Sequence, residues 1–349
     1  MSRHLSPLTL AFMLSLLALV AACDESPTLT GPKESPSAAV AAASSYTAQS
    51  FGIAGEADTR ATGINAAGQV VGYEFDPDDV FRAYIWKNGV FTHLGSLAGG
   101  DTKAFDINDF GQVVGSSRNA AGKMRAFRWR NGSMAGLGTL GGGESVAFGI
   151  NNDGHVVGQS QLRGNTRRHA FLLKNGVMSD LGTLGGANSA ALDINQAGRV
   201  VGWSETASGV RHPFLWRNGV MKDLMQPSST GTGTAYAINA VGVVVGERNN
   251  RAFRWESGVF GGLGLPTREA SVATAIRGGY IVGGVHGRAF VRVGGEVTLL
   301  PMLSNGVASL AYGVNGAGVV VGQTIIDLDP SCPNGGCAEF QLATVWTPE

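Results

Sequence analysis

The stretch INNDGHVVGQSQ occupies residues 150–161, and its first nine residues recur in close copies along the chain. Most copies read Ile or Val, Asn, two variable residues, Gly, one variable residue and Val-Val-Gly. The residues in the Asn position, at intervals of 38 to 44 residues, are Asn65, Asn108, Asn151, Asn195, Asn239, Arg277 and Asn315. Seven units of this length indicate a propeller or a solenoid.

Two turns within the units carry residues that favour hairpins. In the Asn-x-x-Gly segment, Asn stands first and Gly fourth, which are their preferred positions in a type I turn. A second turn contains Asn-Gly, which accepts positive φ at both central positions. It occurs at 88–89, 131–132, 175–176 and 218–219. We interpret the repeated Asn residues as turn formers, and a ring of ligand-binding side chains is the alternative.

Four strand-like segments fill each unit. In the third unit they are 146–150, 155–161, 169–174 and 177–184. Short strands separated by turn residues are typical of a four-stranded antiparallel blade. Three positions before the Ile or Val, every unit has an alanine, which we expect where innermost strands crowd the axis of a propeller. The seven are Ala61, Ala104, Ala147, Ala191, Ala235, Ala273 and Ala311.

Aromatic residues recur in the third segment of the units. Phe or Tyr stands at 84, 127, 171, 214, 253 and 290, and Trp stands at 86, 129, 216, 255 and 346. This pattern predicts a buried layer between blades. A surface on which carbohydrate stacks is the alternative.

The two ends of the repeat region complement each other. The chain finishes with a third strand at 343–346 and has no fourth, whereas residues 46–51 resemble a fourth strand with no preceding blade. Pairing these ends removes the exposed edges that an open array would have. The sequence therefore predicts an all-β fold: a closed seven-bladed β-propeller of four-stranded antiparallel blades over 46–349, its ring closed by the N-terminal strand.

The triplet His169-Ala170-Phe171, followed by LLKNGVMSDLGTLGG, resembles the HAF-type extracellular repeat of bacteria. The resemblance extends from about residue 58 to 346, and the final unit departs from it with Leu342-Ala343-Thr344. It implies an exported, repeat-built domain and supplies no catalytic residues. Other units have a basic residue at the head of the triplet, at 82, 125, 212, 251 and 288. These residues predict bonds to a neighbouring blade, and a ring that binds an anion or acidic glycan is the alternative.

The N-terminus reads as an export signal over 1–22, with an apolar run too short to span a bilayer. The run ends in Val20-Ala21-Ala22-Cys23, which resembles a bacterial lipobox, and Cys23 is the expected lipidation site. An ordinary secretory signal with a chance Cys is the alternative. Residues 23–45 are rich in Ser, Pro, Ala and Thr and predict a flexible tether. In an exported protein, Cys332 and Cys337 are expected to form a disulfide.

Two acidic loops interrupt the repeat. EFDPDDV at 74–80 and IDLDPSCPNGGCAEF at 326–340 become neighbours when the ring closes. We predict a partner or Ca²⁺ site there, since hard cations take carboxylate oxygens; solvated acidic loops are the alternative. The candidate residues are Asp76, Asp78, Asp79, Asp327 and Asp329. No other cofactor is expected.

The composition and motifs favour a binding protein over an enzyme. Lys plus Arg equals Asp plus Glu at 26 each, which argues against nucleic acid as a partner. No nucleophile, zinc-protease or phosphate-loop motif is found. We expect a monomeric, non-catalytic binding or scaffold lipoprotein of the bacterial cell envelope with a protein or glycan partner. The alternative is a glycan-acting enzyme with its site at the propeller axis, for which the first strands offer Asp106 and Asp193.

Overall fold

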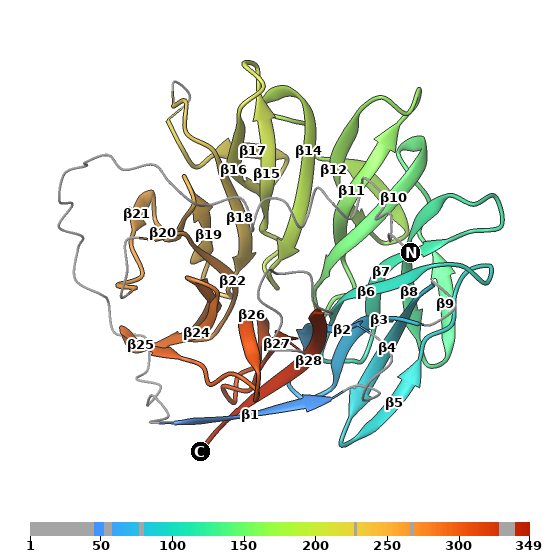
Figure 1. The fold of residues 1–349 in the computed structure, drawn as a ribbon. Coiled ribbons are helices and arrows are strands. Elements are labelled where there is room, and N and C mark those ends of the chain that lie inside the picture. Colours follow the sequence, from blue (N-terminus) through green and yellow to red (C-terminus); the bar gives the residue numbers. More distant parts are fainter. Residues whose placement is uncertain (1–44, 52–57, 77–79, 227–228, 266–268, 328–338) are drawn as a thin grey trace. The chain divides into compact units, whose positions relative to one another are not determined.

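The computed structural model describes residues 45–51, 58–76, 80–226, 229–265, 269–327 and 339–349. All of them belong to one unit of the chain, and they form 28 strands with no helix among them. The strands make seven separate four-stranded sheets arranged in a ring (Figure 1). The predicted seven-bladed propeller is therefore confirmed.

Each blade runs from an innermost first strand to an outer fourth strand. The first strands are β2 (Asp58–Ile64), β6 (Thr102–Ile107), β10 (Gly141–Ile150), β14 (Gly185–Ile194), β18 (Gly233–Ile238), β22 (Ser271–Arg277) and β26 (Gly306–Val314). The second strands are β3 (Val70–Phe75), β7 (Val113–Arg118), β11 (Val156–Leu162), β15 (Val200–Thr206), β19 (Val244–Arg248), β23 (Tyr280–Val285) and β27 (Val320–Asp327).

The outer half of each blade is a second hairpin. The third strands are β4 (Phe81–Lys87), β8 (Met124–Arg130), β12 (Arg168–Lys174), β16 (Arg211–Arg217), β20 (Arg251–Glu256), β24 (Arg288–Val293) and β28 (Glu339–Pro348). The fourth strands are β5 (Val90–His93), β9 (Ser133–Gly136), β13 (Val177–Asp180), β17 (Val220–Asp223), β21 (Val259–Gly261), β25 (Glu296–Leu299) and β1 (Tyr46–Phe51). We number the blades 1 to 7 in the order of their first strands.

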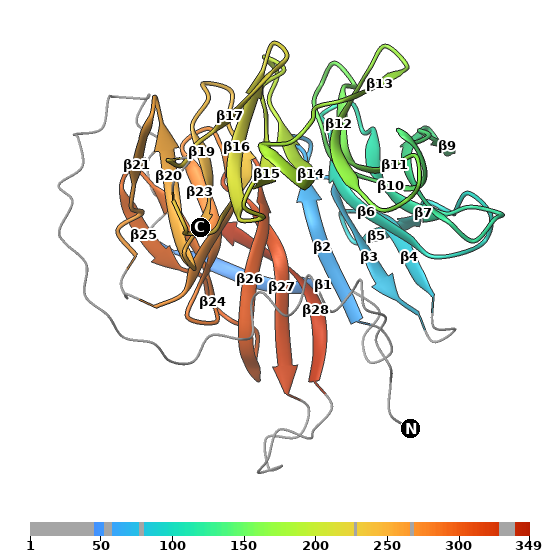
Figure 2. The ribbon, with the colours of Figure 1, turned by 90° about the horizontal axis from the view of Figure 1, so that it is seen from above.

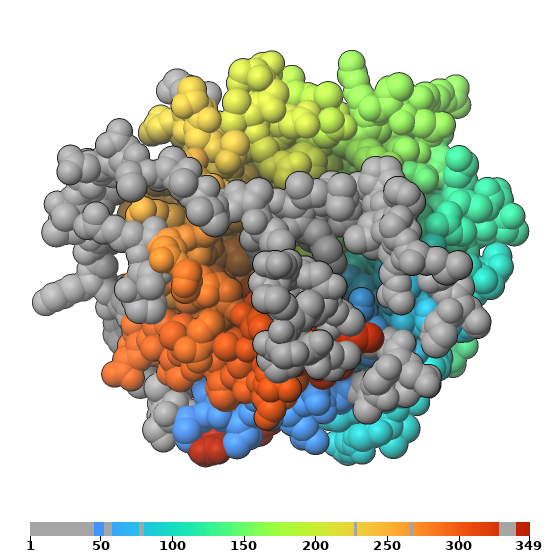
Figure 3. All heavy atoms as spheres, viewed as in Figure 1, coloured from blue at the N-terminus to red at the C-terminus, as the bar shows by residue number. Residues whose placement is uncertain are grey.

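The ring closes through the N-terminal strand, as predicted. β1 pairs antiparallel with β28, from Tyr46 opposite Pro348 to Phe51 opposite Ala343. In the space-filling view the blue residues of β1 therefore lie beside the red C-terminal residues (Figure 3). Each innermost strand also contacts the next one, including β26 with β2. Blade 7 thus takes its fourth strand from the start of the folded region.

The ring has two different ends, and the strands run between them (Figure 2). The Asn-x-x-Gly and Asn-Gly turns lie at the same end of the ring. In blade 1, Val70 begins β3 just after the Asn65 turn and pairs with Trp86, which lies just before the Asn88-Gly89 turn. We call this end the turn face. The loops from second to third strands, such as 119–123 and 163–167, lie at the opposite end, which we call the loop face.

The turns have the geometry that their residues predict. Asn65 Oδ1 accepts from Ala67 N at 3.1 Å and Gln69 N at 2.9 Å, which holds the Asn-x-x-Gly segment in place. Gly68 has a φ of +72°, a conformation that glycine adopts without strain. Asn88 and Gly89, in the second turn of blade 1, both have positive φ. The turn-forming interpretation of the Asn residues is confirmed.

The same asparagines also join neighbouring blades, a role that sequence reasoning missed. Asn65 Nδ2 donates to Asn108 O, and Asn108 Nδ2 to Asn151 O, each at 3.1 Å. The series continues through Asn195 and returns from Asn315 to Asn65 O at 3.5 Å. Each buried side-chain amide therefore accepts from the backbone N–H groups of its own turn and donates to a carbonyl of the next blade.

The sixth unit has Arg277 in place of Asn, and its side chain crosses the ring. Arg277 Nη2 lies 3.0 Å from Asp109 Oδ2 of blade 2. Asp109 also accepts from Ala66 N of blade 1 and Asn152 Nδ2 of blade 3. One carboxylate thus connects four blades at the turn face.

A β-bulge recurs in the first strands and explains the Val-Val-Gly motif. In blade 3, Ala147 pairs with Gly158 and Gly149 with Val157, so Phe148 has no partner on the second strand. The bulge presses the first strand onto the glycine: a Cβ on Gly158 would lie 2.0 Å from Val146 O. A Cβ on the equivalent glycine of any blade would lie 1.9 to 2.1 Å from a first-strand carbonyl oxygen.

The seven alanines are fully buried as expected, but the expected reason was wrong. They pack between sheets, as Ala104 does beside Val71 of blade 1 and Phe127 of its own blade. The bulge residues that follow them include bulky ones, such as Phe105 and Tyr312. Crowding between blades, rather than crowding at the axis, therefore requires the small residue.

The repeated aromatic residues of the third strands form the core between blades. Tyr84 and its five Phe counterparts are buried. Trp255 and Trp346 are buried, whereas Trp86, Trp129 and Trp216 are half-buried. The inter-blade layer is thus confirmed for the Phe and Tyr positions.

Replacing Gly158 by Ala tests the close contact at the bulge. We expect the free energy of unfolding to fall by about 3 kcal/mol or more, because the added methyl meets a backbone carbonyl that cannot rotate away. Gly176→Ala in the same blade is the control: nothing lies within 4 Å of its Cβ, and only its positive φ costs about 1–2 kcal/mol. Equal losses in urea denaturation would contradict the packing account.

Candidate functional site

The acidic loops belong to adjacent blades, because ring closure places blade 7 beside blade 1. Arg60 Nη2 of β2 donates to Gln341 Oε1 of β28 at 2.6 Å, and Gln341 N donates to Asp58 Oδ1 at 2.9 Å. Both contacts lie at the loop-face end of the strands. Asp78, Asp79 and Asp329 lie outside the described residues, so the joint acidic site stays a prediction.

The two described members of that site already have partners. Asp76 is buried, accepts from Val80 N at 3.2 Å and pairs with Arg82 of its own blade. Asp327 N donates to Asn305 O at 3.1 Å. Within the described ranges, no group of three His, Cys, Asp or Glu side chains is arranged to hold a metal ion.

The three cysteines, Cys23, Cys332 and Cys337, also lie outside the described residues. Lipidation of Cys23 and the disulfide stay predictions. In the part of the chain that the structure describes, no helix is long and apolar enough to cross a membrane.

Two basic residues at the head of the third strands bind within their own blades. His169 Nδ1 lies 2.8 Å from Asp180 Oδ2, and His212 Nδ1 lies 2.8 Å from Asp223 Oδ2. Both carboxylates end the fourth strand of the same blade. The sequence predicted bonds to a neighbouring blade, which is wrong for His169. His212 Nε2 also lies 3.2 Å from Ser229 O, on the segment that leads to blade 5.

The carboxylates of the first strands serve the backbone. Asp106 accepts from Ile107 N at 2.8 Å and from Ile150 N of the next blade at 2.9 Å. Asp193 accepts from Ile194 N at 2.7 Å and from Ile238 N at 2.8 Å in the same way. Burial, followed by the charge of Asp193, raises the pKa of Asp106 to about 7. Burial also raises the pKa of Asp193.

A cluster of cations and aromatic rings lies at the inner edge of blades 7, 1 and 2, toward the loop face. Its first cation is Arg60, whose guanidinium lies 5.7 Å from the ring centre of Tyr73 and 5.8 Å from that of Tyr312. Its Nη2 binds Gln341, but its buried Nε has no hydrogen-bond partner. Arg60 therefore retains an unused donor among aromatic faces.

The second cation of the cluster is Lys103 of β6. Its Nζ lies 3.4 Å from the ring centre of Phe81 and 5.0 Å from that of Tyr73. Burial, and then the charge of Arg60, lowers the pKa of Lys103 to about 8, with Asp101 acting in the opposite direction. Its ammonium makes no hydrogen bond to the described residues.

We name Arg60, Tyr73, Phe81, Lys103 and Tyr312 the cationic cluster. All five residues are half-buried rather than sealed in the core. Two cations held close together without a bonded carboxylate attract an anion, because an anion relieves their repulsion and accepts their free N–H groups. The aromatic faces suit flat apolar surfaces such as those of sugar rings. The arrangement fits binding of an anionic, ring-containing ligand.

A second, different group lies on the first three strands of blade 4 and blade 5. The Arg211 guanidinium stacks 3.9 Å from the ring centre of Trp203. Tyr236 Oη donates to Glu247 Oε1 at 3.3 Å, and burial raises the pKa of both Tyr236 and Glu247. The two sides of the ring thus differ in chemistry, although the fold repeats.

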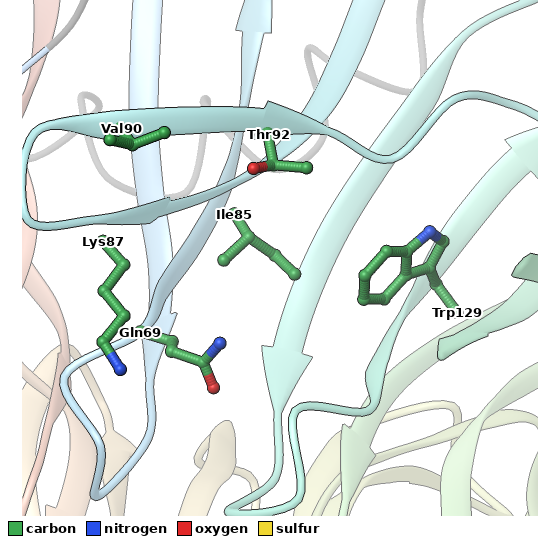
Figure 4. Close-up of a pocket in the computed structure, with 6 residues that line it drawn as sticks. All are labelled: Gln69, Ile85, Lys87, Val90, Thr92 and Trp129. Atoms are coloured by element: carbon green, nitrogen blue, oxygen red, sulfur yellow. The ribbon is translucent and has the colours of Figure 1, made fainter. Parts of the chain in front are cut away.

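A pocket lies between blades 1 and 2, where Trp129 faces Ile85 and Thr92 (Figure 4). Its volume is about 220 Å³, below the ~300 Å³ at which ligand pockets usually begin. Its lining consists of Gln69, Ile85, Lys87, Val90, Thr92 and Trp129.

The cationic cluster was missed from the sequence, yet a signal for it exists. The residue before each invariant alanine is uncharged in five units, as Val146, Ala190, Thr234, Val272 and Leu310. In the first two units it is Arg60 and Lys103. A break in the repeat at one register therefore marks the cluster.

No protein-family model and no curated protein matches the chain. Among solved structures, it is similar to TolB from Acinetobacter baumannii, with 12% identity, a TM-score of 0.43 and coverage of 65% of this chain and 60% of TolB. A gluconolactonase from Xanthomonas campestris gives 11% identity, a TM-score of 0.39 and coverage of 70% and 86%. The Aleuria aurantia lectin, solved as a mutant with Fucα1-6GlcNAc, gives 11% identity and a TM-score of 0.37, with coverage of 82% of this chain and 91% of the lectin.

Asp106→Asn tests the buried carboxylate by its pH dependence. The pKa of Asp106 is raised in the fold to about 7, against ~3.9 for an unfolded Asp. Its contribution to stability is therefore full below about pH 4 and is lost as the pH rises to about 7. We expect the unfolding free energy to fall less over this interval in the variant than in the parent, although the variant loses one side-chain oxygen that accepts from a backbone N–H. Asp153→Asn, on an exposed turn, is the control; a parent-like slope in Asp106→Asn would contradict the assignment.

Proposed function

We propose that this protein is a non-catalytic binding lipoprotein of the bacterial cell envelope. It is anchored through lipid on Cys23 and presents its loop face to an acidic glycan. The observation that carries the proposal is the cationic cluster, where Arg60 and Lys103 lie among aromatic rings with unused donors. Anionic groups of the glycan bind the cations, and its sugar rings lie against Tyr73 and Tyr312.

The chemistry of the axis supports binding over catalysis. Glycoside hydrolysis needs two carboxyl groups, one that donates a proton and one that attacks or activates water. Asp106 and Asp193 each accept two backbone N–H groups instead, and so hold neighbouring blades together. The observation that favours the enzyme alternative is Glu247, whose raised pKa suits a proton donor beside Tyr236.

The joint acidic site and the disulfide belong to the same proposal. We propose that Asp76, Asp78, Asp79, Asp327 and Asp329 add contacts to the partner or a Ca²⁺ ion. A bond between Cys332 and Cys337 would restrict the acidic loop at 326–340.

Replacing Arg60 and Lys103 together by Gln tests the proposed ligand class. With polygalacturonate as the carboxylated probe and neutral dextran as the comparison, we expect the parent to bind only the acidic polymer. The double variant should bind at least tenfold more weakly, since each charge-assisted hydrogen bond contributes about 1.5–3 kcal/mol.

The matched control is Arg163→Gln with Arg167→Gln, two exposed cations of the loop face. An equal loss in the control would contradict a specific cluster. Release of new reducing ends from the polymer, abolished by Glu247→Gln, would favour the enzyme alternative.

Cys23→Ala tests the anchor separately. We expect the parent in the membrane fraction with an acylated N-terminal peptide, and the variant in the soluble fraction. The measurement is fractionation with mass spectrometry of that peptide. Membrane retention of the variant together with an unacylated parent peptide would contradict lipidation.

A further inference from the structure

The tips of four successive blades carry the same basic residue pattern at the turn face. Lys87, Arg130, Lys174 and Arg217 each end a third strand and precede an Asn-Gly turn. All four side chains are exposed, and none makes an ion pair or hydrogen bond to the described residues. They form a basic arc over blades 1 to 4. The tips of blades 5 and 6 carry Glu256 and Glu296 instead.

Apolar side chains project beside these cations. Directly after the Asn-Gly turns, Val90, Val177 and Val220 are 64%, 65% and 66% exposed. Phe110 and Val241, in the Asn-x-x-Gly turns, are 72% and 76% exposed. With Val259, six of the seven large apolar residues that are exposed among the described ones lie at this face. Protruding apolar side chains among cations are typical of proteins that lie on a membrane surface.

The folded region also begins at the turn face. Tyr46, the first residue of β1, pairs with Pro348 at the end of β28. Trp346, also on β28, pairs with Val320, which follows the Asn315 turn. Ser45 therefore leaves this face, on blade 7 beside blade 1. Cys23 stands only 22 positions earlier, and the tether predicted between the two residues would span ~25 Å as a flexible chain. The proposed anchor holds this face near the bilayer.

We infer that the turn face docks on a bilayer of anionic phospholipid, with blades 1 to 4 in contact. The inference extends the proposed lipid anchor to an orientation of the protein. Lys87, Arg130, Lys174 and Arg217 bind lipid phosphates, and the neighbouring valines enter the headgroup layer. The loop face points away from the bilayer. Its exposed cations are interspersed with carboxylates that form ion pairs, such as Asp101 and Glu144. The cationic cluster is then open to its ligand.

The test uses the full chain with Cys23→Ala, so that no lipid on the protein contributes to binding. We expect this chain to float with vesicles of phosphatidylglycerol and phosphatidylcholine at roughly 0.1 M salt, where charges act over ~10 Å. It should not float with phosphatidylcholine alone. Replacing the four basic tip residues by Ser should weaken binding to the anionic vesicles at least tenfold. Val90→Ser with Val177→Ser and Val220→Ser should weaken it further without removing charge.

The matched control removes four cations of the loop face, Lys123, Arg163, Arg167 and Arg251, which are also exposed. Binding should be unchanged there, and thermal unfolding should show that both quadruple variants remain folded. Equal losses in the two variants, or no binding to anionic vesicles at all, would overturn the inference. Tip-dependent binding to soluble dextran sulfate without binding to vesicles would overturn it as well. Because Cys23 is absent throughout, failure here is distinguishable from failure of the proposed anchor.

Discussion

The shape of this protein depends on a shared asparagine amide. In each regular unit the side-chain oxygen accepts from the backbone of its own turn, while the side-chain nitrogen donates to the carbonyl of the next blade. One residue therefore shapes a hairpin and sets the position of its neighbour. A turn with another polar residue would lose a buried hydrogen bond of about 0.5–1.5 kcal/mol and leave a carbonyl without a donor. This link joins six of the seven units to the next blade.

Local patterns in the sequence were sufficient to predict the fold. Turn residues, strand lengths and the orphan segment 46–51 act over a few positions or at the two ends, and the structure agrees with each. Contacts between units were not predictable in the same way. The amide link joins residues 43 or 44 positions apart, and the bulge that requires glycine at 158 depends on two strands meeting. The alanines were expected to relieve crowding at the axis, and that was wrong because their packing also depends on contacts between blades.

The candidate site illustrates the other side of repetition. Positions that recur are explained by folding, so specificity belongs to positions that differ from their counterparts. Arg60 and Lys103 break a register that is otherwise uncharged, and Arg277 breaks the asparagine series to reach Asp109 across the ring. The acidic loops interrupt the repeat over several consecutive residues, whereas Arg60 and Lys103 are single changes inside regular strands. A comparison of the seven units, register by register, is sufficient to distinguish both cations from their uncharged counterparts.

The closing pair of β1 with β28 has a consequence for how such proteins change over generations. These two strands lie at the ends of the folded region, and Glu349 N meets Ser45 O at 3.1 Å. Recombination that duplicates or removes one internal unit leaves both strands intact. The blades newly brought together still offer each other an alanine, a glycine, an aromatic ring and an asparagine amide. The closing pair therefore does not depend on any single internal unit, whereas the Arg277–Asp109 ion pair needs both of the units that supply it.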